Sequence, residues 1–475
     1  MRGAWPKESL LNMVNLTAGP KKARPDFVGT NLYGPLLWAG VLLSLILCWS
    51  IPTSAGENGL KTTPPEFFQT PADFDSCVKL ALRQSPFFTK SALEIEVRRL
   101  DEKDSKADYF PSFRGTARYY LTQPNDPNVT DPLNYSFAIT TGDYNPLFAH
   151  LSLKAKRVVT QIATLAHLKA ISLGLDRLAK AFLELNSLEN LSKLREQALA
   201  FAKENLRFAR EQQKLGEITP VEVQIASQEV EVAAAELNGL AASKERVQDA
   251  IREFLGLKPG EPLRLDVSKA RSQVLGDFQP QKANLQEAQE RSFDVRIKKL
   301  AQELQSWNVA LSKMKFIPSL NVALQSPDPL SLTNVRGTFF SVGLTFPIFE
   351  GFKRVRDIQR QKTVLQQFAS EETVKADELN QLWREAEEKL DRAAATLRLT
   401  QAQVELARLK ESQAETLYRT AQKDFGVLMA ARQNRIKAQT EAAKAARDYD
   451  QAALALRSLS GNLVYHYVNE AQFQK

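Results

Sequence analysis

The residue types that most often carry catalysis or bind metals are few in this chain and far apart. Its three histidines are His150, His167 and His466, and its two cysteines are Cys48 and Cys77. Metal sites need several such ligands at short, regular spacings, which these residues do not have. Carboxylates are abundant, but they alternate with Lys and Arg as they do on solvated helix faces. The sequence therefore predicts no catalytic, metal or cofactor site and argues against an enzyme.

Charged residues with more suggestive positions follow two glycines that interrupt long helical stretches. Gly216 is followed by Thr219 and Glu222, and Gly426 is followed by Arg432 and Arg435. Aligned on the glycines, Arg432 takes the place of Glu222, because 432 − 426 equals 222 − 216. Two interpretations stay open: the arginines face a shared opening, or they pair with neighbouring carboxylates on a solvated helix face.

The elements that position these residues occur twice, at a constant offset in the numbering. Ala81…Ser85-Pro86 is matched by Ala288…Ser292-Phe293, and Phe110-Pro111-Ser112 is matched by Ile317-Pro318-Ser319. The offsets agree, since 288 − 81 and 318 − 111 both equal 207. Each Pro-Ser is followed by strand-like sequence and then by a long, charge-rich helical stretch. A duplicated unit of strands and long helices is therefore expected.

Strand pairs are expected within 113–141 and 319–346, because apolar and polar residues alternate there. Alternation with aromatic residues on the apolar side is typical of lipid-facing β-barrel strands. A small soluble sheet with one wet face is the alternative. Four strands cannot close a barrel, which needs about eight, and open edges are costly in lipid. If the strands lie in a membrane, several chains must share one barrel.

The helical stretches are unusually long. No proline occurs between Pro146 and Pro220, and none follows Pro347. One helix from Pro146 to Leu215 would measure about 100 Å. Gly216 and Gly426 are expected to fold each long stretch back into a hairpin with apolar seams. An ordinary antiparallel coiled coil without a channel would fit the same pattern.

The N-terminal region resembles a secretory signal peptide. An apolar run, Leu36–Leu47, follows basic residues and precedes small residues suited to cleavage. An uncleaved inner-membrane anchor is the alternative, and the bulky Leu47 argues against lipidation of Cys48. We expect a signal peptide over 1–55, a flexible leader over 56–72, repeats over 73–256 and 281–462, a linker over 257–280 and a C-terminal tail over 463–475.

Net charge excludes a further class of partner. The formal charge is +8, and the basic residues are spread along helices whose charges alternate in sign. A nucleic-acid footprint would be clustered, so no nucleic-acid partner is predicted.

The order and spacing of these pieces resemble the TolC family of bacterial outer-membrane efflux channels. The resemblance rests on the two Pro-Ser entries, on Ser341-Val-Gly-Leu-Thr-Phe-Pro347-Ile-Phe-Glu-Gly351 and on the turn Gly216-Glu-Ile-Thr219-Pro-Val-Glu222. It implies a mainly α-helical homotrimer in the outer membrane. Four strands per chain would form a 12-stranded β-barrel, and the helical hairpins would form an α-helical barrel in the periplasm.

The same resemblance implies a passive exit duct for efflux or type I secretion. Its partners would be outer-membrane lipid, a periplasmic adaptor (membrane fusion) protein and an inner-membrane pump. The tips marked by Gly216, Thr219, Glu222 and Gly426 would dock the adaptor, and Arg432 and Arg435 would ring the periplasmic aperture. The family usually has acidic residues at that place. The competing hypothesis is a periplasmic coiled-coil adaptor or scaffold without a pore, and the duplicated strand pair argues against it.

Overall fold

The computed structural model describes residues 71–119, 133–258, 261, 263–276, 278–326, 339–346, 348–420 and 424–468. All of them belong to one compact unit, Thr62–Lys475. The predicted signal peptide over 1–55, the leader up to residue 70 and the end of the C-terminal tail lie outside the described residues.

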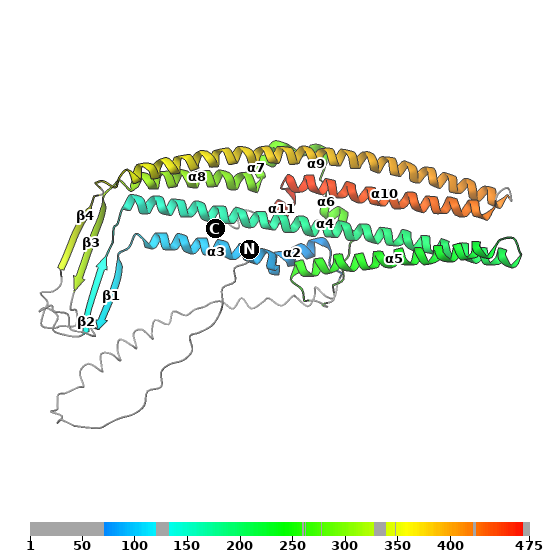
Figure 1. Ribbon diagram of the computed structural model, residues 1–475, viewed down its shortest axis with the longest axis horizontal. Helices are drawn as coiled ribbons and strands as arrows, with labels where there is room; N and C mark the ends of the chain where they lie inside the picture. Colours follow the sequence, from blue (N-terminus) through cyan, green and yellow to red (C-terminus); the bar gives the residue numbers. More distant parts are fainter. Residues whose placement is uncertain are drawn as a thin grey trace, which may run out of the picture. The chain divides into compact units, whose positions relative to one another are not determined.

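Long helices and one small antiparallel sheet make up the fold, which confirms the predicted fold class (Figure 1). The first repeat comprises α2 (Phe74–Gln84), α3 (Pro86–Ala107), β1 (Ser112–Tyr119), β2 (Leu133–Thr140), α4 (Pro146–Lys214) and α5 (Pro220–Leu255). The second comprises α7 (Leu285–Arg291), α8 (Phe293–Met314), β3 (Ser319–Ser326), β4 (Phe339–Thr345), α9 (Lys353–Arg419) and α10 (Phe425–Leu459). Between them lie α6 (Ala270–Leu275) and the 3₁₀ helix η2 (Pro280–Lys282), and α11 (Asn462–Tyr467) follows α10.

The repeats correspond element by element. Helices α3 and α8 both have 22 residues, and strands β1 and β3 both have 8. The second-repeat elements start at the offset predicted from the sequence, since 293 − 86 and 319 − 112 both equal 207. The long helices α4 and α9 keep the same offset, because 353 − 146 is also 207. Each long helix packs against the helix that follows its tip, α4 against α5 and α9 against α10 (Figure 1).

A break at Ser85 separates α2 from α3. Ser85 has extended backbone angles, φ −61° and ψ 125°, which a residue before proline favours. Pro86 then starts α3 at a position where a missing N–H costs nothing. The Ser85 hydroxyl donates to the carbonyl oxygen of Phe254 at 2.7 Å and so ties this break to the end of α5.

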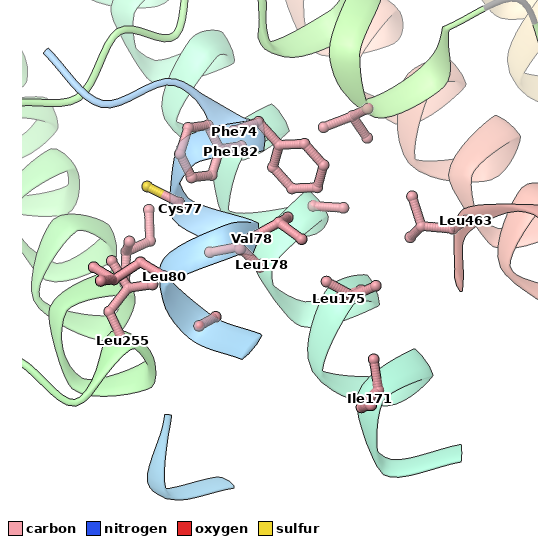
Figure 2. Packing of buried hydrophobic residues seen from close by; sticks show 14 of the residues in the cluster. Phe74, Cys77, Val78, Leu80, Ile171, Leu175, Leu178, Phe182, Leu255 and Leu463 are labelled. Carbon is pink, nitrogen blue, oxygen red and sulfur yellow. The ribbon is translucent and has the colours of Figure 1, made fainter. Parts of the chain in front are cut away.

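The largest apolar core lies where α2, α4 and the short helices meet (Figure 2). Phe74 of α2 packs edge-on against Phe182 of α4, with ring centroids 5.4 Å apart. Leu175 and Leu178 of α4 are fully buried beside them. Cys77 is also buried there, and burial raises the pKa of its thiol to about 12. This thiol is therefore a core side chain and not a nucleophile.

The predicted linker and the start of the predicted C-terminal tail contribute to this core. The predicted linker, 257–280, holds helix α6 and the buried side chains of Val267, Ala270 and Val274. Its backbone also pairs with the segment just before α2, where Asp266 N–H donates to the Ala72 carbonyl oxygen at 3.0 Å. The predicted tail, 463–475, begins inside α11, whose Leu463 is buried. Helix α6 contacts α2, α4 and α10, so the predicted linker packs against helices of both repeats.

Candidate functional site: an apolar sheet and two hairpin tips

The four strands form one sheet with the order β1-β2-β3-β4, all antiparallel. Phe113 pairs with Ile139, Ile139 with Leu324, and Leu324 with Phe340. These four apolar residues therefore form a continuous row across both repeats. They are 40–69% exposed. The sheet thus has an apolar face left open to its surroundings.

The opposite face carries small and polar residues. Ser112 pairs with Thr140, Thr140 with Ala323, and Ala323 with Ser341. The Thr140 hydroxyl also contacts Asn321 Oδ1 at 3.4 Å. A sheet with one polar and one uncovered apolar face is costly in water, but it is the arrangement of a barrel wall between lipid and lumen.

The outer strands of this sheet each pair on one side only within the described part of the chain. β1 pairs with β2, and β4 pairs with β3. The free sides of β1 and β4 present backbone groups that can pair with another strand. This is the open-edge geometry expected of a sheet that continues into a neighbouring chain.

The first hairpin tip is built around a helix cap. Gly216 adopts a left-handed backbone, φ +76°, just after the end of α4. Thr219 caps α5, and Glu222 completes a capping box: the Thr219 N–H donates to Glu222 Oε2 at 2.6 Å, and the Glu222 N–H donates to Thr219 Oγ1 at 3.4 Å. Thr219 and Glu222 therefore have a local structural role at this tip.

The second tip differs from the alignment predicted on glycines. Helix α9 ends at Arg419, and Asp424 is the N-cap of α10, so Gly426 lies inside the first turn of α10 and not in the connection. The offset between the two N-caps is 424 − 219 = 205, which is smaller than the 207 of the strands. On this offset Val427 corresponds to Glu222, and Arg432 corresponds to Ser227. The predicted equivalence of Arg432 and Glu222 is wrong.

Both arginines of the predicted aperture are engaged by carboxylates within the chain. Arg435 Nε lies 2.9 Å from Glu411 Oε2 of α9, and Arg432 Nε lies 3.9 Å from Glu411 Oε1. Arg432 also donates to Glu204 Oε2 of α4 at 3.3 Å, and its guanidinium lies over the ring of Phe201. Within the chain, two carboxylates therefore balance the two guanidinium groups. The place of Arg432 and Arg435 at the periplasmic aperture stays a prediction.

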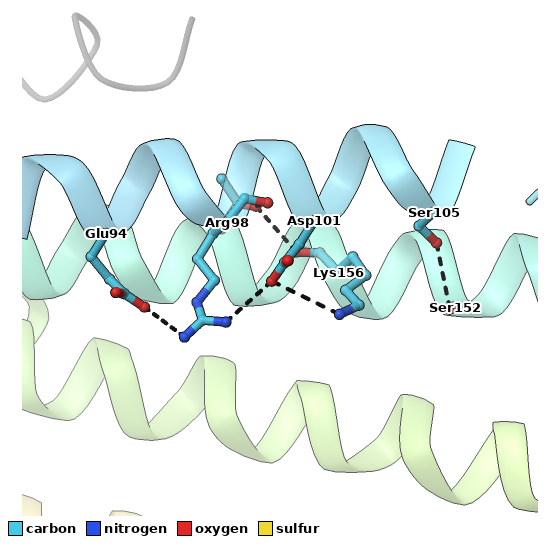
Figure 3. A network of polar contacts seen from close by, with 7 residues as sticks. Glu94, Arg98, Asp101, Ser105, Ser152 and Lys156 are labelled. Carbon is cyan, nitrogen blue, oxygen red and sulfur yellow. Dashed lines mark hydrogen bonds and ion pairs between the residues drawn. The ribbon is translucent and has the colours of Figure 1, made fainter. Parts of the chain in front are cut away.

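Other charged residues form ion pairs within one helix or between neighbouring helices. Arg98 of α3 contacts Glu94 at 2.5 Å and Asp101 at 3.1 Å, and Lys156 of α4 lies 3.9 Å from Asp101 (Figure 3). Among the described residues, no group of His, Cys, Asp and Glu is placed to hold a metal ion. His167 is buried and shares a hydrogen bond of 2.8 Å between its Nδ1 and the Ser91 hydroxyl. The Ser91–His167 and Asp101–Lys156 contacts join α3 to α4.

Helix α4 contains a window apolar enough to cross a membrane by length and composition. Half of that window is buried inside the protein. Its neighbours are α3, α5, α8 and α10. The apolar residues of α4 are thus used mainly in helix packing.

Comparison with known proteins supports the fold. No protein-family model matches the sequence, and no curated protein matches it by sequence. Solved structures do match. The Campylobacter jejuni outer membrane channel CmeC is 14% identical, with a TM-score of 0.69 over 84% of this chain and 88% of that one. CusC, described in terms of folding and transmembrane channel formation, is 14% identical, with a TM-score of 0.68 over 83% of this chain and 93% of that one.

The open state of the Neisseria gonorrhoeae MtrE outer membrane channel also matches, with 14% identity and a TM-score of 0.58 over 82% of this chain and 88% of that one. Coverage is thus nearly complete in both directions for all three structures, although identity is low. The chain has the fold of these outer membrane channels. The resemblance to the TolC family noted in the sequence is confirmed at the level of the fold.

Proposed function

We propose that three copies of this chain form a channel in the bacterial outer membrane that serves as a passive exit duct. The observation that carries this proposal is the exposed apolar row across β1, β2, β3 and β4. A lipid bilayer would cover that row and remove it from water. No soluble element in the described part of the chain does so, since the four residues remain 40–69% exposed.

Strand number supports the trimer. A closed barrel needs about eight strands or more, and the chain supplies four. Three chains would supply 3 × 4 = 12 strands and pair each free β1 edge with a free β4 edge. Closure would satisfy the edge backbone groups that lipid cannot solvate. The polar face of the sheet would then line the lumen.

Helix length supports a periplasmic duct. Helix α4 has 69 residues, which corresponds to about 100 Å. Together with α9 it would carry the channel away from the membrane as an α-helical barrel. In this proposal the channel is passive, and the energy for transport would come from other proteins. Tripartite efflux or type I secretion is the proposed setting.

The partners would be a periplasmic adaptor protein and an inner-membrane pump, with the adaptor docking at the two tips. Gly216, Thr219, Glu222 and Gly426 mark the proposed docking region. Glu222→Gln separates docking from stability, because glutamine can keep the capping box while the charge is lost. We expect this variant to assemble normally and to lose efflux only if the charge contacts the adaptor.

A periplasmic adaptor or scaffold without a pore is disfavoured by the same sheet, because a soluble protein would bury its apolar face. The test is reconstitution of the mature chain in planar bilayers, with the subunit number measured by mass in detergent. We expect discrete conductance steps and a mass of three chains. A monomer in the soluble periplasmic fraction, or inserted trimers without conductance, would refute the channel.

A further inference from the structure

A strongly basic surface lies where the chain leaves β4 and enters α9. Five cationic side chains line a groove of about 260 Å³ at this junction, and we call them the basic patch: Lys315, Lys353, Arg354, Arg356 and Arg360. Four belong to the start of α9, and Lys315 follows the end of α8. The patch therefore sits directly beside the sheet.

Carboxylates balance only part of this charge. Glu350 accepts two hydrogen bonds from Arg354, at 2.7 and 2.9 Å, and Asp357 contacts Lys315 Nζ at 3.0 Å. The groove has no other acidic side chain, so its net charge is 5 − 2 = +3. Lys353, Arg356 and Arg360 are exposed, and none of them forms an ion pair with a described carboxylate. Arg356 donates a hydrogen bond to the uncharged Gly351 carbonyl oxygen at 2.9 Å. Three positive charges are thus available to an outside partner.

Lys353 and Arg356 lie in the first turn of α9, where positive charge destabilises the helix unless an anion is bound nearby. The first turn of α9 contains no acidic residue, and its N-cap, Phe352, provides no side-chain hydrogen bond. Cations at a helix N-terminus oppose the helix dipole, which favours negative charge there. Lys353 and Arg356 also repel each other. An anion held by the basic patch would offset both effects.

Apolar side chains flank the basic patch on the chain that links β4 to α9. Ile348 is 93% exposed, Phe349 73% and Phe352 65%. The two phenylalanine rings pack edge-on with centroids 5.6 Å apart. Phe346 precedes them and continues the apolar alternation of β4. Exposed apolar side chains beside unpaired cations are typical of the boundary between a bilayer core and its headgroups.

We propose that the basic patch binds the phosphate groups of anionic phospholipids in the leaflet nearest the helices, while Ile348, Phe349 and Phe352 contact their acyl chains. This inference rests on the proposed function, because it requires the sheet to lie in a membrane. A soluble phosphate compound would satisfy the cations but would leave the three apolar side chains in water. A phospholipid satisfies both groups at once, which is why we favour it.

The expected effect can be stated as a change in affinity. One Lys or Arg near an anionic membrane surface corresponds to about a fivefold gain in binding. Three such charges correspond to about 100-fold at low salt, and the gain shrinks as salt screens the patch. The variant K353Q/R356Q/R360Q removes these charges and keeps both ion-paired cations. R384Q/K389Q/R398Q is the matched control, since it removes three exposed cations from α9 farther from the sheet.

The experiment uses the mature full-length chain in detergent, with mass and conductance measured first on each sample. Dihexanoyl-phosphatidylglycerol, dihexanoyl-phosphatidylcholine and inorganic phosphate are then titrated separately, and binding is followed by the shift in thermal midpoint. We expect phosphatidylglycerol to bind wild type and the control at least tenfold more tightly than K353Q/R356Q/R360Q. Ile348→Ser with Phe349→Ser should also weaken phosphatidylglycerol binding and leave phosphate binding unchanged.

Equal binding of phosphatidylglycerol by wild type and K353Q/R356Q/R360Q would overturn the proposal. Phosphate binding as tight as phosphatidylglycerol binding would overturn it too, in favour of a soluble anion site. The affinity of the wild-type chain for phosphatidylglycerol at low and high salt is a measurement that needs no variant. An affinity that does not fall at high salt would also count against the basic patch. A sample without trimers or conductance would instead show that the proposed function fails.

Discussion

Removing the carboxylate of Glu411 tests the tip cluster most directly. Among the described residues, Glu411 is the one carboxylate that contacts both Arg432 and Arg435, and its side chain is only 14% exposed. Two unit charges about 4 Å apart attract by about 4 kcal/mol at an effective dielectric constant near 20. Desolvation of the carboxylate and partial exposure of both arginines, 22% and 27%, offset much of this attraction. We expect Glu411→Gln to lower the unfolding free energy by about 1–3 kcal/mol.

A double-mutant cycle isolates the interaction. Glu411→Gln, Arg435→Gln and the double variant are compared by urea unfolding in detergent, followed by helical circular dichroism. We expect a coupling of at least ~1 kcal/mol. Glu405→Gln is the matched control on the same helix, since its partner Arg408 lies at 3.7 Å and both side chains are more than half exposed. That control should cost less than ~0.5 kcal/mol. Zero coupling, or equal losses for Glu411→Gln and Glu405→Gln, would refute the reasoning.

Three further outcomes follow from the strands, the core and the backbone. Val342→Arg, on the apolar face, should make membrane insertion less favourable by about 2–4 kcal/mol, and Ser341→Arg, on the polar face, should cost much less. The measurement is the yield of trimer after refolding into lipid. Equal losses of yield for the two variants would count against a bilayer location of the sheet. Cys77 should resist iodoacetamide at pH 8, where a thiol of pKa about 12 is ~10⁻⁴ ionised. Because this pKa is raised from 9.0, the stability contributed by the protonated thiol is complete below pH 9 and is lost as the pH rises toward 12. Labelling of Cys77 should therefore rise as the protein unfolds. Labelling of the folded trimer at pH 8 would contradict burial of the thiol. Gly256→Ala should lower the free energy of unfolding by about 1–3 kcal/mol, because φ is +73° and a Cβ would lie 2.9 Å from Pro86 Cδ. Gly239→Ala, within α5 and with open space around it, should raise that free energy by about 0.5–1 kcal/mol. Thermal unfolding measures both, and the opposite order would contradict the backbone geometry.

The long elements could be predicted from sequence because their signals are periodic and uninterrupted. The absence of proline after Pro146 predicted a helix to Leu215, and α4 ends at Lys214. Alternation within each strand also predicted which residues share a face. The pattern could not give the pairing that joins Ile139 to Leu324, because that contact depends on how the two repeats meet in space.

The second tip could not be placed in the same way. Gly426 served as a landmark, but the first turn of a helix tolerates glycine, and the actual cap is Asp424. Hairpin symmetry is a signal that could have found Glu411. The connection between Arg419 and Phe425 is centred at position 422, so Glu411 faces position 433, between Arg432 and Arg435, because 422 − 411 equals 433 − 422. The contact of Arg432 with Glu204 joins residues far apart in the sequence and has no local signal.

The difference between the two hairpins has a consequence for whatever meets them end-on. Helix α9 has 67 residues and α4 has 69, a difference that corresponds to about 3 Å of helix. In the proposed trimer, the two kinds of tip would alternate around the rim, three of each. One kind begins its second helix with the Thr219–Glu222 capping box, and the other begins at Asp424, which makes no side-chain capping bond among the described residues. A partner that meets this rim would therefore face two chemically different contacts in turn.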